Sequence, residues 1–386
     1  MMLTFLNLIV VSGVLVGLIA GAERAVKAES LGDIVISELD GEDRILETEA
    51  LVRAIETYDE IQNYSVRYQG SAVLEANYKE RRNLAAERDI ANATVTGIDP
   101  VQEDAMSGLS DNLIAGEYLN PNEEGYILIG YYYLEENAEQ FGDIFDTLSN
   151  IAPGVPVRLT AGDVSKEFIV KGIVQSKVDE VSLNTYIPER EFRRLFGRLN
   201  PDADQIVIRV AKPEQESAVQ RGLIASGFAN YAKIQLYEEA KPKFITDIKN
   251  TMNLLGTFIG SIGIVVASIT IFIIIFINAI SRRQQIGILK GIGIERRAIE
   301  IAYVIQAAFY ALLGSALGAL LTYGFLIGFF ERNPIKFPFS DGILVAPPEE
   351  TFIRFVVLFA ITLVAGFVPA WLIVKQNTLN SILGRK

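Results

Sequence analysis

Four apolar stretches constrain the fold of this chain more than any other feature. They cover residues 1–22, 254–280, 302–330 and 351–374, and the second holds 27 positions without a charged side chain. About 20 apolar residues suffice for a helix to cross a bilayer core. The pattern therefore predicts a membrane protein with four transmembrane α-helices, one before and three after a large polar region.

The first stretch, residues 1–22, allows two interpretations. A retained anchor fits its length, whereas the small residues Ala20, Gly21 and Ala22 resemble the cleavage site of a secretory signal peptide. The positively charged start of a signal peptide is missing, and the apolar run is long for one. We therefore interpret 1–22 as transmembrane helix 1.

The polar region between the first two spans is strongly acidic. Residues 23–250 carry 41 Asp and Glu against 24 Lys and Arg, whereas the rest of the chain carries 6 against 11. Strand-like alternation is mixed with helical patterns at 48–60, 131–150, 188–199 and 214–222, which predicts an α+β domain over 23–237. A domain of this size can divide into two subdomains, and the stretch 118–124 is the expected boundary.

A single helix is expected to join this domain to the second span. Residues 238–253 place Phe244, Ile245 and Ile248 on one face and charges on the other, and they run without a break into 254–280. We predict a stalk helix at 238–253, followed by a membrane domain at 254–386.

The segment 281–299, SRRQQIGILKGIGIERRAI, is short, basic and amphipathic. Lys and Arg in short loops are retained in the cytoplasm. The segment is thus predicted to be a cytoplasmic interfacial helix that a partner can push. By alternation, both chain ends are cytoplasmic, and the acidic domain is extracytoplasmic.

Pairs of glycines four residues apart recur in the predicted spans. Small residues at this spacing let membrane helices approach closely, although glycine is also common in such helices for no special reason. The candidate packing glycines are Gly256, Gly260, Gly314, Gly318, Gly324 and Gly328.

Several functional classes are excluded or disfavoured by what the sequence lacks. It has no His and no Cys, which excludes His-dependent catalysis and Cys-based zinc sites, and it contains no phosphate-binding loop. Ion-coupled carriers usually bury an ionisable residue within a span, and none lies in the middle of any span here. The acidic balance disfavours nucleic acid as a partner. We expect no catalytic, cofactor or metal site in this chain.

Two motifs resemble the FtsX-like permease family of ABC transporters. The segment QQIGILKGIGIERRAI is similar to that family's loop signature, and Pro369, Ala370 and Trp371 resemble its closing Pro-Ala motif. The polar region is similar to the external domain of MacB-type macrolide exporters and of lipoprotein-release (LolC/LolE-like) permeases. Gln285 stands where the family usually has Glu, and no ATPase domain is fused to the chain.

The resemblance implies a function by mechanotransmission in the plasma (inner) membrane. A cytoplasmic ATPase dimer, which binds ATP and Mg²⁺, would move the loop helix, and the motion would reach the external domain to export or extract a lipoprotein, peptide or amphiphilic compound. Further implied partners are a second permease, identical or paralogous, and a periplasmic adaptor or carrier. The alternative is a regulatory permease that transports nothing and activates a cell-wall hydrolase. The implied ATPase-coupling residues are Arg282, Arg283, Gln285, Ile286, Gly287, Ile288, Leu289, Lys290 and Gly293.

Overall fold

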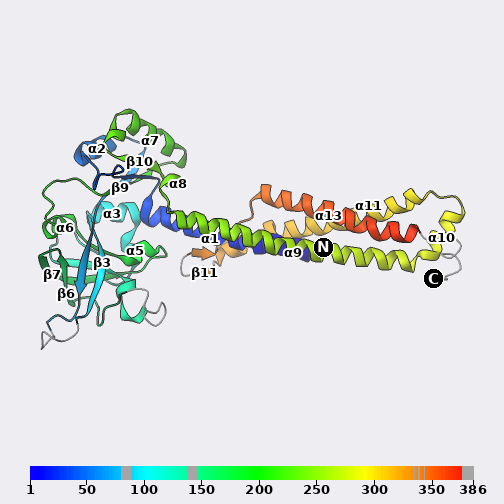
Figure 1. Cartoon of the computed structure of the whole chain (residues 1–386), viewed down its shortest axis with the longest axis horizontal. Helices are drawn as coiled ribbons and strands as arrows, with labels where there is room; N and C mark the ends of the chain where they lie inside the picture. The colour runs from blue at the N-terminus through cyan, green and yellow to red at the C-terminus, as the bar shows by residue number, and fades with distance from the viewer. Residues whose placement is uncertain (80–87, 138–145, 334, 338–339, 343, 376–386) are drawn as a thin grey trace. The chain divides into compact units, whose positions relative to one another are not determined.

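The computed structural model describes residues 1–79, 88–137, 146–333, 335–337, 340–342 and 344–375. It divides into a helical unit, Met1–Gly21 with Phe244–Lys386, and a sheet unit, Ala22–Lys243. Figure 1 draws both units.

Four helices are long and apolar enough to cross a membrane, which confirms the predicted arrangement of one plus three. They are α1 (Met2–Val26), α9 (Lys243–Ser281), α11 (Arg296–Leu321) and α13 (Pro348–Val374). A π-helical turn, η8 (Thr322–Leu326), and the short α12 (Ile327–Arg332) extend α11. The remaining elements of the helical unit are α10 (Arg283–Gly291), β11 (Ile335–Phe337) and β12 (Ser340–Gly342).

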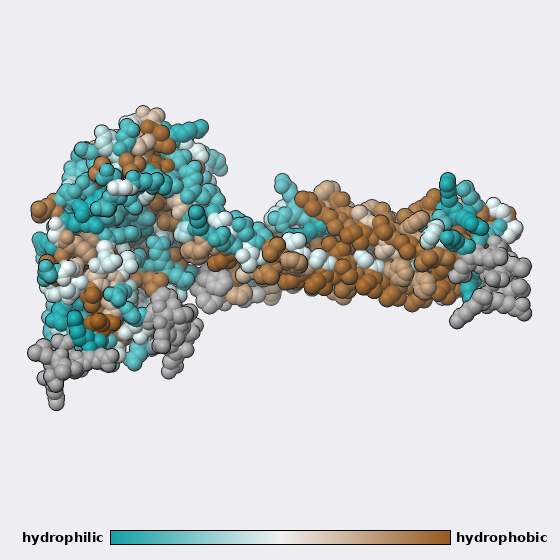
Figure 2. Space-filling model, in the orientation of Figure 1, coloured by the Kyte–Doolittle hydropathy of each residue, from teal (hydrophilic) through white to brown (hydrophobic). Residues whose placement is uncertain are grey.

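The helical unit buries one stripe of each helix and exposes apolar side chains on the other faces. Ile275 of α9, Ala307 of α11 and Ala370 of α13 are fully buried, whereas Leu320 and Phe352 are mostly exposed. Figure 2 shows the resulting hydrophobic surface over the long helices. Such a surface suits a lipid environment, because exposed apolar patches of this extent are rare in soluble monomers.

The sheet unit is built on a ten-stranded mixed sheet with the order β10-β1-β9-β2-β3-β8-β5-β7-β4. The remaining strand, β6, pairs with both β2 and β7, so β2, β3, β8, β5, β7 and β6 close a ring. The strands are β1 (Ile34–Ser37), β2 (Ile61–Glu75), β3 (Ile90–Ile98), β4 (Leu113–Gly116), β5 (Tyr126–Gly130), β6 (Pro156–Ala161), β7 (Val164–Val174), β8 (Asn184–Pro188), β9 (Gln205–Val210) and β10 (Lys233–Leu236). The helices are α2 (Thr48–Ile55), α3 (Pro100–Ser107), α5 (Asp179–Leu183), α6 (Glu189–Leu195), α7 (Glu216–Ala225) and α8 (Tyr237–Ala240).

Two main hydrophobic cores lie in the sheet unit, but the expected boundary at 118–124 is wrong. One core joins β1, β9 and β10 to α2 and α7, so it combines the two ends of the domain in sequence. The other gathers strands of the ring and α6. Strands on both sides of 118–124, β4 and β5, pair with the same strand β7, and the chain therefore does not divide there.

The stalk helix begins five residues later than the sequence suggests. The α8 helix ends at Ala240, Lys241 is extended (φ −57°, ψ 140°), and α9 starts only at Lys243. Pro242 explains the break, because proline disfavours the helical conformation of the residue before it.

The expected helix over 131–150 is also wrong for the residues that the structure describes. Tyr131–Tyr133 and Glu135–Asn137 form two separate 3₁₀ turns. Leu134 then pairs with Leu148 in an isolated parallel bridge, and the Asn137 amide donates to the Tyr131 carbonyl. This side-chain bond closes the turn locally, which asparagine favours over helix continuation. Residues 138–145 lie outside the described residues.

Candidate functional site

The predicted helix over 281–299 is shorter in the structure. The segment contains the end of α9, the separate helix α10 and the start of α11. The α9 helix ends at Ser281, Arg282 leaves the helical conformation, and α10 occupies Arg283–Gly291. Gly293 then adopts a positive φ of 96°, which glycine tolerates without strain, and α11 begins at Arg296. Of the expected coupling residues, Arg282 and Gly293 flank α10 rather than lie in it.

One face of α10 is anchored in the helical unit. Ile286 is 5% exposed and joins a cluster with Tyr303 of α11 and Ile373 of α13, and Gly287 is buried beside it. The Lys290 ammonium donates to the carbonyl of Val374, over 2.9 Å, at the end of α13. Burial, followed by the charge of Arg296, lowers the pKa of Lys290. The α10 helix is therefore tied to the ends of both α11 and α13.

The opposite face of α10 and the turn after it expose apolar side chains. Ile288 is 54% exposed and Ile292 72%, and Leu289 and Ile294 are also exposed. Arg282, Arg296 and Arg297, which flank this stretch in the sequence, are exposed as well. An apolar centre within a charged rim is the composition of a protein-binding surface.

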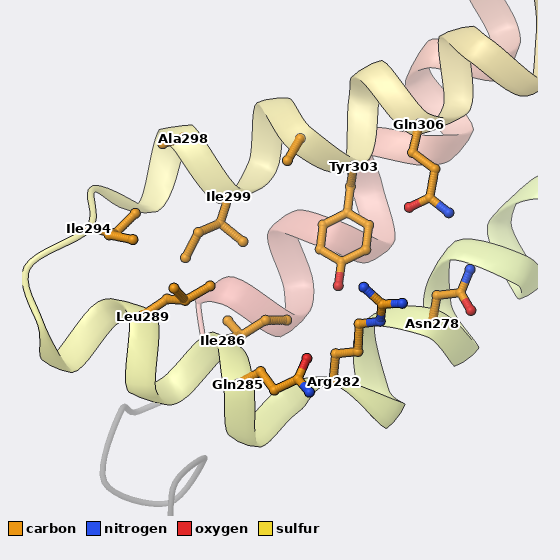
Figure 3. A pocket seen from close by; sticks show the side chains of 11 residues that line it. Asn278, Arg282, Gln285, Ile286, Leu289, Ile294, Ala298, Ile299, Tyr303 and Gln306 are labelled. Atoms are coloured by element: carbon orange, nitrogen blue, oxygen red, sulfur yellow. The ribbon is translucent and has the colours of Figure 1, made fainter.

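A third side of α10 lines a cavity of about 470 Å³ between the end of α9 and the start of α11. Figure 3 shows Arg282, Gln285 and Leu289 along one wall and Tyr303 and Gln306 along the other. No local sequence pattern indicates this cavity, because it depends on the break at Arg282 that separates α10 from α9.

The candidate packing glycines fall into two groups. A Cβ atom on Gly318 would lie 2.9 Å from the Phe5 ring, one on Gly314 would lie 2.5 Å from Met1, and one on Gly256 would lie 3.2 Å from Ser12. These three therefore lie against α1, and Gly260 reaches only the edge of Leu8. By contrast, Gly324 and Gly328 have no atom within 4 Å of a built Cβ among the described residues.

Gly366 of α13 is a close-packing glycine that the sequence analysis missed. Its Cβ would lie 2.5 Å from Ala307 of α11 and 3.0 Å from Ile275 of α9, so three helices meet at this position. No second glycine stands four residues before or after it, which is why the spacing rule did not find it.

The closing motif lies at the end of α13. Pro369 sits inside the helix and is buried, Ala370 is fully buried, and Trp371 is partly exposed. The Lys375 ammonium lies 4.8 Å from the centre of the Trp371 ring, close enough for a cation–π contact. The motif therefore ends within one turn of Val374, whose carbonyl accepts the hydrogen bond from Lys290.

The sheet unit contains a buried ion pair that the sequence analysis also missed. The Arg67 guanidinium binds Glu103 through Nε–Oε2 at 2.8 Å and Nη2–Oε1 at 2.7 Å, and both side chains are nearly inaccessible. Burial alone would raise the pKa of Glu103, but Arg67 outweighs it and lowers that pKa. The Nη1 atom of Arg67 donates to the Ser30 carbonyl at 2.7 Å, in the π-helical turn (Lys27–Leu31) that follows α1.

A second contact connects the two places where the chain enters and leaves the sheet unit. The Lys241 ammonium lies 3.1 Å from the Glu23 carboxylate, and the Tyr237 hydroxyl donates to the Glu23 carbonyl at 3.1 Å. Glu23 lies near the end of α1, and Lys241 directly precedes Pro242 and α9. The end of α1 is therefore bound to the segment that directly precedes α9.

Several acidic side chains of the sheet unit form ion pairs. Glu75 is buried between Arg88 and Arg158, and the hydrogen bond from Arg88 and that from Arg158 lower its pKa to about 2 despite burial. Glu123 pairs with Lys171. Across the described residues, no group of three or more His, Cys, Asp and Glu could hold a metal ion.

Comparisons with known proteins place the helical unit in a family. Residues 257–378 match the family model described as FtsX-like permease C-terminal. Among curated proteins, the chain is similar to the macrolide export ATP-binding/permease proteins MacB of Burkholderia thailandensis, 26% identical over 212 residues, and Acinetobacter baylyi, 26% identical over 208 residues. Each match covers 52% of this chain but only 31% and 30% of the relatives, so the chain spans about a third of their length.

Two solved structures show a weaker likeness. The periplasmic region of MacB from Actinobacillus actinomycetemcomitans gives a TM-score of 0.39 at 14% identity, covering 55% of this chain and 92% of that one. The extracellular domain of the noncanonic ABC-type transporter YknZ from Gram-positive bacteria gives 0.36 at 14% identity, covering 53% and 100%. Residues 257–378 thus match an FtsX-like permease domain, and this match, the MacB relatives and the four membrane-length helices support a membrane permease of the FtsX/MacB type.

Proposed function

We propose that this chain is the membrane subunit of an ABC transporter and that α10 is the contact for a separate ATPase chain. One observation carries the proposal: Ile288 of α10 and Ile292 directly after it are exposed, while Ile286 and Lys290 tie α10 to α11 and α13. A partner that binds the exposed face would therefore move the ends of α11 and α13 together with α10. ATP and Mg²⁺ would be bound by the partner, in keeping with the ATP-binding/permease names of the MacB relatives.

The proposed topology places α10 and both chain ends in the cytoplasm and the sheet unit outside, in the inner membrane. The eight Lys and Arg of the loop and the chain end support this orientation, because basic residues in short segments are retained inside. The acidic sheet unit has no such restriction, since long domains are translocated largely regardless of their charge.

Transmission would use α1 and α9, which each continue along the chain into the sheet unit. The α9 helix has 39 residues without a break, and a helix of that length spans about 58 Å. The Lys241–Glu23 pair and the Arg67 contact with Ser30 would hold the receiving ends in place. Movement of the helices would therefore reach the strands β1 and β2 rather than be lost in a loose connection.

The proposed cargo is a lipoprotein, a peptide or an amphiphilic compound that is extracted or expelled on the outer side by mechanotransmission. The exporter names of the relatives favour export over regulation. A second permease, identical or paralogous, and a periplasmic adaptor or carrier would complete the assembly.

The test is co-purification of the ATPase with the chain carrying Ile288→Asp. A carboxylate at an interface centre leaves a desolvated charge unpaired, so we expect binding to weaken by about tenfold or more. Leu199→Asp is the matched control, because Leu199 is 96% exposed in the sheet unit and should leave binding unchanged.

Equal ATPase recovery with both variants would refute the contact at α10. If the ATPase is lost from Ile288→Asp but the purified complex moves no cargo and instead binds a cell-wall hydrolase, the regulatory alternative replaces the transport proposal while the contact stands.

A further inference from the structure

The cavity beside α10 has a polar end and an apolar end. Figure 3 shows the Arg282 guanidinium directed toward the Tyr303 hydroxyl, with the amides of Asn278 and Gln306 together on one side of the pair. Ile286 and Ile299 line the opposite end. This division matches a ligand that is itself charged at one end and apolar at the other.

The polar end is suited to an anion. Its lining provides a guanidinium, three amides and a phenol as hydrogen-bond donors, and none of the lining side chains is acidic. Within the described residues Arg282 has no carboxylate within ion-pair distance, so its charge is available to a ligand. Arginine binds phosphate oxygens through two parallel hydrogen bonds, which makes a phosphate ester the best match.

We also expect the cavity to lie at the depth of the lipid phosphates. Asn278 and Arg282 flank the end of the uncharged run 254–280, where a membrane helix leaves the hydrocarbon core. Basic pockets between membrane helices at this depth suit anionic headgroups. The apolar lining continues toward α11, where the first carbons of an acyl chain would contact Leu289 and Ile299.

We propose that this cavity binds an anionic phospholipid, with its phosphate at Arg282, Asn278 and Tyr303 and its acyl ester region against Leu289 and Ile299. A lipid in this position would fill the gap between α9, α10 and α11 and would hold α10 at a fixed distance from α11. Leu289 and Ile294 belong both to the cavity wall and to the exposed apolar face, but Ile288 and Ile292, on which the ATPase contact rests, do not line the cavity. The lipid site can therefore be tested apart from the ATPase contact.

The experiment is native mass spectrometry of the delipidated full chain in mild detergent. The probes are phosphatidylglycerol, phosphatidylcholine and inorganic phosphate, each titrated separately. The wild-type chain should retain phosphatidylglycerol at least tenfold more tightly than phosphatidylcholine. Arg282→Gln should remove this preference, since a charged hydrogen-bond donor contributes about 1.5–3 kcal/mol and tenfold corresponds to about 1.4 kcal/mol.

Arg297→Gln is the matched control, because it removes the same charge from the same loop but outside the cavity. It should retain the preference for phosphatidylglycerol. Equal losses in Arg282→Gln and Arg297→Gln would mean diffuse attraction to a basic surface and would overturn the proposal. Tight binding of inorganic phosphate, with no preference between the lipids, would assign the site to a free anion and would overturn it as well.

A second variant guards against misfolding of Arg282→Gln. Gln285→Glu keeps the size of the side chain but places a carboxylate in the cavity wall. It should weaken phosphatidylglycerol binding while phosphatidylcholine binding and the unfolding temperature stay at the wild-type values. Unchanged phosphatidylglycerol binding in this variant would also overturn the proposal.

Discussion

At the scale of single residues, Arg67 is the side chain whose loss should cost most. Arg67→Met would leave the Glu103 carboxylate buried without its partner, and breaking a buried ion pair destabilises a fold by about 3–5 kcal/mol. Thermal unfolding of the full chain in detergent measures the effect. Arg53→Met is the matched control, because the ion pair between Arg53 and Glu49 is exposed. This variant should lower the free energy of unfolding by less than about 1 kcal/mol. Similar melting temperatures for the two variants would contradict the assigned role.

Glu75 should make the sheet unit sensitive to acid. Its folded pKa of about 2 lies below the ordinary 4.5, so its ionised form stabilises the fold above pH 4.5 and that contribution disappears as the pH falls from 4.5 toward 2. Glu75→Gln should lower the free energy of unfolding by about 2 kcal/mol at pH 7, allowing for the solvent around the arginines. Between those pH values, the stability of this variant should depend less on pH than that of the wild type. Unfolding temperatures across this range provide the measurement, and a parallel decline in both proteins would contradict it.

At the scale of helices, Gly366 should tolerate no added methyl group. Its Cβ would lie 2.5 Å from Ala307, so Gly366→Ala should force α11 and α13 apart and destabilise the helical unit by roughly 1–3 kcal/mol. Gly328→Ala is the control at a position with open space, and it should have no such effect. The comparison uses unfolding temperatures in one detergent. A loss in Gly328→Ala as large as in Gly366→Ala would reveal a general effect of glycine instead.

Elements whose signal is local could be predicted from the sequence. The four apolar runs depend on neighbouring residues, and the structure confirms them as long helices. Pro242 is also a local signal, because it predicts a break between α8 and α9. The apolar face of 238–253 instead predicts one continuous helix, and the structure shows the break.

Features that depend on distant residues could not be predicted. Gly314 and Gly328 share the same spacing rule, yet only Gly314 lies against a neighbouring helix, because the position of α1 decides the contact. Arg67 finds Glu103 and Ser30 at separations of 36 and 37 positions. No local pattern carries this information, and the cavity beside α10 has the same origin.

At the scale of the whole molecule, the proposed topology predicts which cysteines a membrane-impermeant maleimide can reach. The natural chain has no Cys, so single substitutions give a clean signal. Asp163→Cys, in the turn between β6 and β7, should be labelled in intact cells, whereas Arg297→Cys should be labelled only after permeabilisation. Labelling of both in intact cells would place the basic loop and the sheet unit on one side and would contradict the mechanism.

The ring of β2, β3, β8, β5, β7 and β6 leaves the described sheet with only β4 and β10 as free borders, each four residues long. Unpaired backbone groups at such borders are where foreign strands attach and fibrils begin. If a protease released the sheet unit from its anchors, the liberated fragment would offer little template for stacking. The released fragment should therefore remain soluble rather than aggregate.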